Sequence, residues 1–284
     1  MVRQLADLLG TSRARIKRFE RELMELGWLR ALDGIDLSVS AVDLDVTDAG
    51  CLELVEVTST GRRRLADMLG LDATTAHRYH GLLGSGRAAT ARRRRLLQIL
   101  AHTLGTNDVF VAFALAAAGA RRAGGTDELS EWRAAAACER QRCKPDGYGL
   151  YTRDGVGYGF LLEYDRGTES ARKYAAKFRA YYRYRNSGQA ARDYDGLPTI
   201  LFVTTSASAE DRIAEQAYRA WFSRGAEPLP VLLTTTAHIR KQMEGILGPI
   251  WRWPGDARGN MARRTYWLPS RCRPVTARKV EAKG

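Results

Sequence analysis

Three short apolar runs in the second half of the chain constrain its fold more than any other feature. They comprise residues 156–165, 198–205 and 229–236, and helical patterns separate each run from the next. Apolar runs of this length, bounded by Gly, Pro or Asp, are typical of buried strands. Strands that alternate with helices predict a mixed β-sheet flanked by helices, so we expect an α/β (α+β) fold for this half.

An Asp-Gly pair adds a hairpin to the expected sheet. Asp154 and Gly155 separate residues 148–153 from residues 156–165. Asp-Gly is a favoured two-residue turn between antiparallel strands. We therefore expect the first apolar run to pair with the segment directly before it.

Helices are expected on both sides of this hairpin. The alanine-rich stretch 128–141 predicts a helix before it. A longer helix should follow the hairpin, capped by Thr168 and reaching about Tyr184. Residues 209–222 predict a further helix between the last two apolar runs.

A basic pair of helices opens the chain. Gly10 ends a short amphipathic stretch, and Ser12 can cap the helix that follows. The expected DNA contacts on this second helix are Arg13, Arg15, Lys17, Arg18 and Arg21. With the β-prone residues after it, the pattern predicts an N-terminal, all-α winged helix-turn-helix region at 1–58, whose second helix would enter the major groove. The alternative is an ordinary solvated pair of helices.

A helical region is expected at 59–125. Residues 63–83 partly repeat the pattern of residues 3–23, so a second helix-turn-helix and a chance likeness both stay open. Four consecutive arginines in this region are expected to add affinity for phosphates: Arg92, Arg93, Arg94 and Arg95. The Gly-rich stretch 121–125 predicts a boundary, and residues 126–284 form the expected sheet domain with its basic C-terminal tail.

The charge of the chain indicates a polyanionic partner. The net charge is +13 and the isoelectric point is about 9.9. A surplus of this size favours nucleic acid, and we expect double-stranded DNA. The alternative is an arginine-rich background that runs through a whole proteome. Whether the chain forms a homodimer stays open.

Other sequence features predict a cytoplasmic protein, associated with the nucleoid or a plasmid. The start of the chain has no signal-peptide pattern. The longest apolar stretch, residues 109–118, is too short to span a bilayer, so no membrane partner is expected. The four cysteines fit neither a zinc site nor a disulfide framework, and no small-molecule cofactor is expected.

Carboxylates gather at one end of the expected hairpin. Glu163 and Asp165 should point to the same face of their strand, because side chains alternate. Asp146 begins the paired strand, so antiparallel pairing should bring it beside them. Oxygen ligands of this kind suit Mg²⁺ or Mn²⁺, and the three acids are the expected metal ligands.

The helix after the hairpin adds cations to these acids. Lys173, Lys177 and Tyr181 recur at four-residue spacing and share one face. A lysine there would position a metal-bound water or a phosphate, so Lys173 and Lys177 join the acids as candidate catalytic residues. The alternative is structural: the acids cap a turn or pair with these lysines and do no chemistry. A nucleophile role for the helix tyrosines is a further, minor alternative.

The segments "PDG", "FLLEYDRGTE" and the lysine and tyrosine after them resemble the replication-relaxation family of plasmids and integrative elements. The sheet domain is similar to the PD-(D/E)XK, restriction-endonuclease-like nucleases. Asp146 and Glu163 match the acids of that nuclease motif, whereas Asp165 stands where the motif has a lysine. The resemblance implies that Lys177 or Lys173 takes over the lysine's role.

These features together predict a DNA-binding protein of a mobile genetic element, engaged in plasmid replication, relaxation or mobilisation. It would nick DNA with a divalent metal, as a metal-dependent endonuclease or relaxase. The alternative is a non-catalytic DNA-binding regulator, or a replication or partition accessory protein, with an inactive nuclease-like domain.

Overall fold

The computed structural model describes residues 5–6, 8–31, 55–68, 70, 87–140, 143–223, 225, 227–258 and 264–268. Within these ranges, the side chains of residues 56, 62, 87–101, 257 and 258 are not described. Contacts divide the chain into two compact units, Met1–Leu104 and Gly105–Gly284. The three-part division expected from the sequence stays a prediction.

The first unit contains a capped helix and a small sheet. Helix α2 (Arg13–Glu25) begins where Ser12 Oγ accepts a hydrogen bond from the Arg15 amide, 3.2 Å away. Strand β1 (Leu29–Ala31) pairs antiparallel with β2 (Val55–Val57), and α3 (Ser59–Met68) follows.

This order agrees with the expected winged helix-turn-helix only in part. Gly10 has the positive φ of 58° that suits a turn between two helices. The segment that joins β1 to β2 and most of the proposed second helix-turn-helix, residues 71–86, lie outside the described residues. The winged helix-turn-helix therefore stays a prediction.

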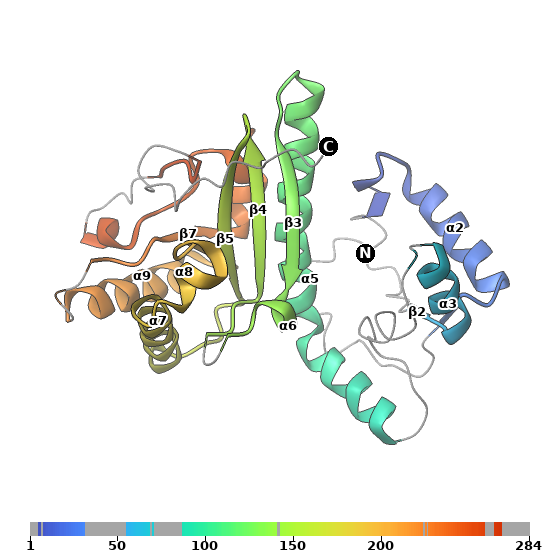
Figure 1. Cartoon of the computed structure of the whole chain (residues 1–284), viewed down its shortest axis with the longest axis horizontal. Helices are drawn as coiled ribbons and strands as arrows, with labels where there is room; N and C mark the ends of the chain where they lie inside the picture. The colour runs from blue at the N-terminus through green and yellow to red at the C-terminus, as the bar shows by residue number, and fades with distance from the viewer. Residues whose placement is uncertain are drawn as a thin grey trace. The chain divides into compact units, whose positions relative to one another are not determined.

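The second unit is built on a five-stranded mixed sheet (Figure 1). Its strands, in spatial order, are β3 (Glu128–Ala134), β4 (Gly147–Arg153), β5 (Val156–Asp165), β6 (Thr199–Thr204) and β7 (Val231–Thr235). The first three strands are antiparallel and the last three are parallel. The mixed sheet expected from the apolar runs is confirmed.

The hairpin turn has the geometry that its sequence favours. Asp154 and Gly155 both have positive φ, 53° and 74°. Two such residues match the right-handed twist of the flanking strands. As a result Arg153 lies opposite Val156, and the register carries on to Gly147 opposite Leu162.

Helices cover both faces of the sheet (Figure 1). One face packs against α7 (Ala171–Asn186), α8 (Gln189–Tyr194) and α9 (Ala207–Phe222). The other packs against Val109, Phe113 and Ala117 of α5 (Arg87–Arg122) and against segments near the C-terminus. The remaining helical elements are short: α6 (Ala135–Cys138), α10 (Thr236–Lys241), η1 (Gly245–Leu247) and η2 (Pro254–Arg258).

Successive side chains of β5 point alternately to the α5 side and the α7 side of the sheet. Phe160, Leu162 and Tyr164 belong to the α5 side of the core, and Leu161 belongs to the α7 side. Glu163 must therefore face α7, as must Asp165. This confirms that the two acids share one face of their strand.

A glycine lets α5 approach the sheet closely. A Cβ atom on Gly105 would lie only 2.0 Å from Cζ of Tyr164. A larger residue would push the helix away from β5 or displace the tyrosine ring. Helix α5 is continuous across this glycine.

Part of α5 has the length and composition of a membrane span. Residues His102–Arg122 form this apolar stretch, which is longer than the run considered in the sequence. Phe113 is fully buried, and its ring lies 4.6 Å from Phe160 and 5.4 Å from Trp267. Packing against the sheet buries Val109, Phe113 and Ala117, and 33% of the stretch is buried in all.

Two local predictions are wrong. Residues 128–141 contain strand β3, and only Ala135–Cys138 is helical. Pairing with β4 and the packing of Trp132 on Phe110, at 4.7 Å, outweigh the helix propensity of the alanines. The residue before α7 is Ser170, not Thr168, and its side chain makes no cap hydrogen bond.

Candidate functional site

The candidate site lies at the end of β5, between the sheet and α7. Glu163 is 1% exposed and Asp165 is 4% exposed. Asp146 directly precedes β4, and its Oδ2 accepts a hydrogen bond of 2.9 Å from the Tyr164 amide. The hairpin register therefore sets Asp146 beside the end of β5, as expected from the sequence.

Both carboxylate oxygens of Glu163 are engaged by α7. Lys177 Nζ donates to Oε2 at 2.7 Å, and the Tyr181 hydroxyl donates a short hydrogen bond to Oε1. The two donors are four residues apart, so consecutive turns of one helix face present them together. The result is a buried acid held by an ammonium group and a hydroxyl.

Burial dominates the electrostatics of this pair. Removal from water raises the pKa of Glu163 to about 7, against the opposing pull of the Lys177 charge. Burial alone would lower the pKa of Lys177, but the negative charges of Glu163, Glu169 and Asp146 raise it above its usual value. Lys177 therefore stays an ammonium, while Glu163 titrates near neutrality.

The Asp165 carboxylate stabilises the turn that follows β5 by accepting hydrogen bonds. Its Oδ2 accepts hydrogen bonds from the Tyr174 hydroxyl at 2.6 Å and the Gly167 amide at 3.0 Å. Thr204 Oγ1 on the neighbouring strand lies 3.5 Å from the same oxygen. Gly167 has a positive φ of 78°, so this carboxylate holds the sharp turn that leads towards α7.

The two candidate lysines differ sharply. Lys177 reaches Glu163, and its side chain is 25% exposed. Lys173, one turn earlier, is exposed, and its charged group makes no ion pair with a described residue. Of the two, only Lys177 can act on the acids at the end of β5.

The helix tyrosines are buried. Tyr174 is fully buried and Tyr181 is 1% exposed. Burial and the neighbouring Glu163 raise the pKa of Tyr181 well above its usual value. A hydroxyl this buried, and already donating to a carboxylate, is a poor nucleophile for DNA.

The acids do not fit a divalent metal as they are arranged. Among the described residues, no group of three His, Cys, Asp or Glu side chains is placed to hold an ion. Both oxygens of Glu163 are taken, one of them by a cation. Mg²⁺ and Mn²⁺ need free carboxylate oxygens and room for bound water.

Two neighbours of the site were not expected from the sequence. Glu169 Oε2 lies 3.8 Å from Lys177 Nζ, so this lysine serves two acids. Burial raises the pKa of the Cys143 thiol to about 12, and Cys143 interacts with both Tyr181 and Glu163. Glu169 stands within the recognised "EYDRGTE" segment, but no sequence pattern singled out Cys143.

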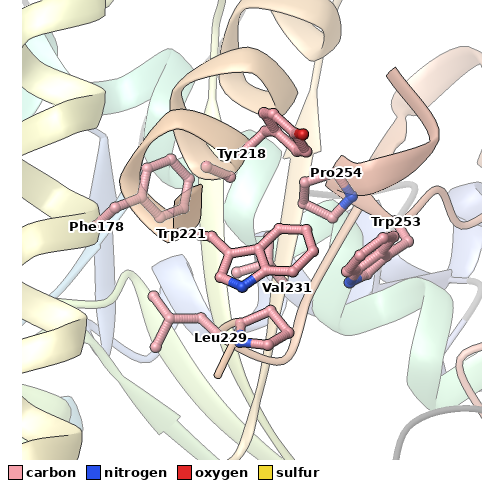
Figure 2. A pocket seen from close by; sticks show the side chains of 9 residues that line it. Phe178, Tyr218, Trp221, Leu229, Val231, Trp253 and Pro254 are labelled. Atoms are coloured by element: carbon pink, nitrogen blue, oxygen red, sulfur yellow. The ribbon is translucent and has the colours of Figure 1, made fainter. Parts of the chain in front are cut away.

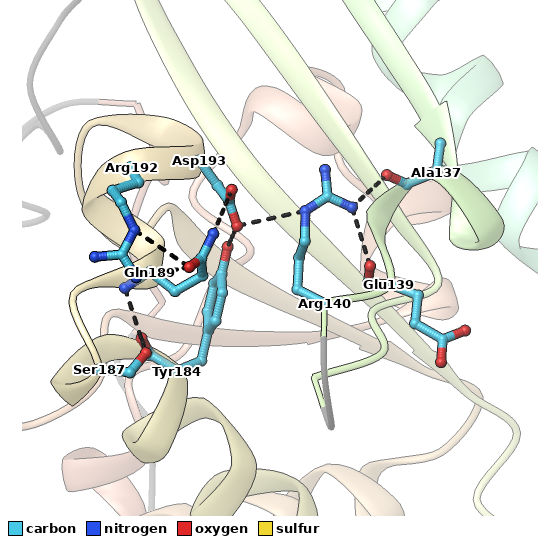
Figure 3. A network of polar contacts seen from close by, with 8 residues as sticks. All are labelled: Ala137, Glu139, Arg140, Tyr184, Ser187, Gln189, Arg192 and Asp193. Atoms are coloured by element: carbon cyan, nitrogen blue, oxygen red, sulfur yellow. Dashed lines mark hydrogen bonds and ion pairs between the residues drawn. The ribbon is translucent and has the colours of Figure 1, made fainter.

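A polar network fixes the far end of α7 (Figure 3). Asp193 on α8 accepts hydrogen bonds from the Tyr184 hydroxyl at 2.5 Å and from Gln189 at 2.9 Å. Arg140, which follows α6, lies 3.4 Å from the same carboxyl group. These contacts tie α7 to α8 and to the segment before β4, and so orient the helix over the site.

An apolar pocket lies between α9, the start of β7 and the start of η2, with Phe178 of α7 at one side (Figure 2). Trp221 and Trp253 both line it, with ring centroids 5.3 Å apart. The lining residues are Phe178, Ala217, Tyr218, Trp221, Pro228, Leu229, Val231, Trp253 and Pro254. They include no carboxylate, histidine or cation, so the pocket offers no acid–base chemistry.

The expected DNA contacts of the first unit are accessible in α2. Its five cations are all exposed: Arg13, Arg15, Lys17, Arg18 and Arg21. Arg18 lies 3.6 Å from Glu22, and the ring of Phe19 lies under the guanidinium groups of Arg15 and Arg18. Arg92 to Arg95 belong to helix α5, but their side chains lie outside the described residues.

The fold and site define a two-unit protein in which a mixed sheet carries a buried acid–lysine pair. A family model described as Replication-relaxation matches residues 2–200 of the 284. The chain belongs to the replication-relaxation family. This family points to a role in the replication or relaxation of mobile elements. The searches of curated proteins and of solved structures found no match.

Proposed function

We propose that this chain binds double-stranded DNA of a mobile genetic element and supports its replication or relaxation without cutting it. It would act in the cytoplasm, with the plasmid or nucleoid. The observation that carries the proposal is a line of cations on α2, formed by Arg13, Lys17 and Arg21 and called the α2 stripe below.

The spacing of the α2 stripe suits a DNA groove. Its residues are four apart, so they line one face of the helix, and Ile16 is buried on another. The helix follows a turn at Gly10 and precedes the β1–β2 sheet. Helix-turn-helix proteins place the start of such a helix against base edges and phosphates.

The interior of the sheet domain supports a role without cutting. Lys177 and Tyr181 satisfy both oxygens of Glu163, and Asp165 is committed to the turn at Gly167. Buried polar groups normally have hydrogen-bond partners of this kind, so these contacts fit a structural role for both acids. The nuclease-like domain would then serve binding or assembly, and a homodimer is one such assembly.

Binding to duplex DNA as a function of salt tests the proposal. We expect wild-type affinity to fall steeply as salt rises. The variant Arg13→Gln/Lys17→Gln/Arg21→Gln should bind about tenfold or more weakly, with a salt slope smaller by roughly 2.7, since each lost phosphate contact removes about 0.9. Fluorescence anisotropy with a labelled duplex measures both quantities.

A matched variant controls for total charge. Arg122→Gln/Lys144→Gln/Arg219→Gln also removes three exposed cations, all in the second unit. It should keep nearly the wild-type slope. Equal losses in the two variants, or a wild-type protein without salt-dependent binding, would contradict DNA recognition by α2.

Metal-dependent nicking is the second candidate function, and one observation favours it. Asp146, Glu163 and Lys177 interact with one another at the ends of β4 and β5, as the nuclease resemblance implies. Metal binding there would require Lys177 and Tyr181 to release Glu163.

Supercoiled plasmid separates the two candidates. Incubated with the protein and Mg²⁺ or Mn²⁺, it should stay supercoiled while band shifts report binding. Nicking that disappears in Glu163→Gln would replace the first proposal by the second. Glutamine keeps one acceptor oxygen, which can face Lys177, and its amide group can donate to the Tyr181 hydroxyl, so loss of folding should not mask the result.

A further inference from the structure

Helix α7 presents a cationic line on the face opposite the candidate site. Its sixteen residues include no Asp or Glu. The large aromatic residues, such as Tyr174, Phe178 and Tyr181, are buried against the sheet. Arg172, Arg179 and Arg183 are exposed on the opposite side, and together they are called the α7 stripe below.

Helical geometry places the three arginines in one line. At 100° per residue, Arg179 and Arg183 lie within about 20° of Arg172 around the helix axis. Arg172 and Arg183 are about 16 Å apart along that axis, from a rise of 1.5 Å per residue. One strand of duplex DNA carries about five phosphates over this length, at one per 3.4 Å.

The side chains of the α7 stripe have no acidic partner among the described residues. None of the three makes an ion pair or a side-chain hydrogen bond there. The surrounding arginines do have partners: Arg140 approaches Asp193, Arg192 donates to Gln189, and Arg212 donates to a carbonyl oxygen. A row of like charges without counter-charges favours a polyanion.

The surroundings of the stripe favour nucleic acid over a membrane surface. Interfacial helices insert large apolar side chains beside their cations. The aromatic residues of α7 face inwards, and between Arg172 and Arg179 the outward position is held by Ala176. The exposed face of the stripe therefore has cations that can bind phosphates but no large apolar side chain that could insert into a bilayer.

We propose that the α7 stripe is a second DNA-binding surface, which holds the phosphates of one strand and is separate from α2. The proposal rests on the proposed function, because it concerns the same ligand. It gives the sheet domain a direct part in holding DNA. Helix α7 is held near its start by Asp165, in its middle by Glu163 and near its end by Asp193, which fixes the position of the stripe.

The test compares an α7 stripe variant, the α2 stripe variant described above and the charge-matched control, all in the full chain, in the same salt titration of duplex binding. Arg172→Gln/Arg179→Gln/Arg183→Gln should lower the salt slope by roughly 2.7. The charge-matched variant Arg122→Gln/Lys144→Gln/Arg219→Gln should leave the slope near wild type. Since all three stripe residues are exposed, urea unfolding should show an unchanged midpoint.

Three outcomes overturn the proposal, and they differ from a failure of the proposed function. The stripe variant could keep the wild-type slope while the α2 variant loses it, and DNA binding by α2 would then stand alone. It could lose no more than the charge-matched control. It could also lose binding to phosphatidylserine vesicles while keeping duplex binding, which would reassign the stripe to a membrane. A wild-type chain that binds no DNA would instead overturn the proposed function.

Discussion

Replacing Lys177 by methionine should destabilise the fold by about 3 kcal/mol at pH 8, the lower end of the cost of breaking a buried ion pair. Methionine keeps most of the apolar stem but removes the charge that faces Glu163. Glu163 is 1% exposed, so water cannot replace the lost ammonium group. Urea denaturation followed by circular dichroism measures the change.

The cost should shrink as the pH falls, because Glu163 can take up a proton. Burial raises its pKa from 4.5 to about 7, so the folded state holds this proton more tightly than the unfolded chain does. The stability that comes from this proton is fully present below pH 4.5 and is lost as the pH rises through 7. Without Lys177 the pKa rises further, so the two proteins should differ more at pH 8 than at pH 5.

Two further variants test whether this loss of stability comes from the Lys177–Glu163 ion pair. Lys173→Met changes the same residue type one turn earlier, where the side chain is exposed, and should alter stability by less than about 0.5 kcal/mol. Adding Glu163→Gln to Lys177→Met should recover more than half of the loss, since neither position then carries a charge. Equal effects of the two lysine changes would show that Glu163 does not depend on its ammonium partner.

Replacing Asp165 by alanine should cost about 3 kcal/mol, because it leaves a buried hydroxyl and a part-buried amide without an acceptor. The Tyr174 hydroxyl and the Gly167 amide both donate to Oδ2. Asp165→Asn keeps an acceptor oxygen and should cost only about 1 kcal/mol. Urea midpoints of the two variants measure the difference.

A double-mutant cycle tests the cause of this loss. Tyr174→Phe should destabilise the wild type by about 1 kcal/mol, yet recover part of the loss in the Asp165→Ala background, because it removes a hydroxyl that has lost its acceptor. Additive effects of the two changes would contradict a structural role for their hydrogen bond. The carboxylate would then be free for another task, and nicking by the protein would regain support.

Local pattern was enough to predict most of the sheet. The Asp154-Gly155 turn, the three apolar runs and the helix at 209–222 all appear where the sequence places them. Strand alternation also predicted that Glu163 and Asp165 share a face. The helix predicted at residues 128–141 was wrong. The alanine-rich stretch favours a helix locally, but these residues pair with β4, and such pairing cannot be read from a short stretch of sequence.

The sequence predicted which residues make up the candidate site, but not the contacts that they form. Asp146, Glu163 and Lys177 interact as expected, but the sequence predicted a gathering of free carboxylates around a metal. The structure instead commits Asp165 to Tyr174 and Gly167, and encloses Glu163 between Lys177 and Tyr181. Which oxygen meets which donor depends on how α7 lies over the sheet.

The sequence by itself determined the order of strands and helices in the sheet domain, the surplus of positive charge and the family to which the chain belongs. These follow from composition and from the periods of strands and helices, which are local properties of the chain. Only the tertiary structure decided that a lysine would neutralise Glu163 and that three arginines of α7 would face solvent together. Burial and charge pairing arise when distant segments pack, and that packing separates a structural carboxylate from a metal ligand.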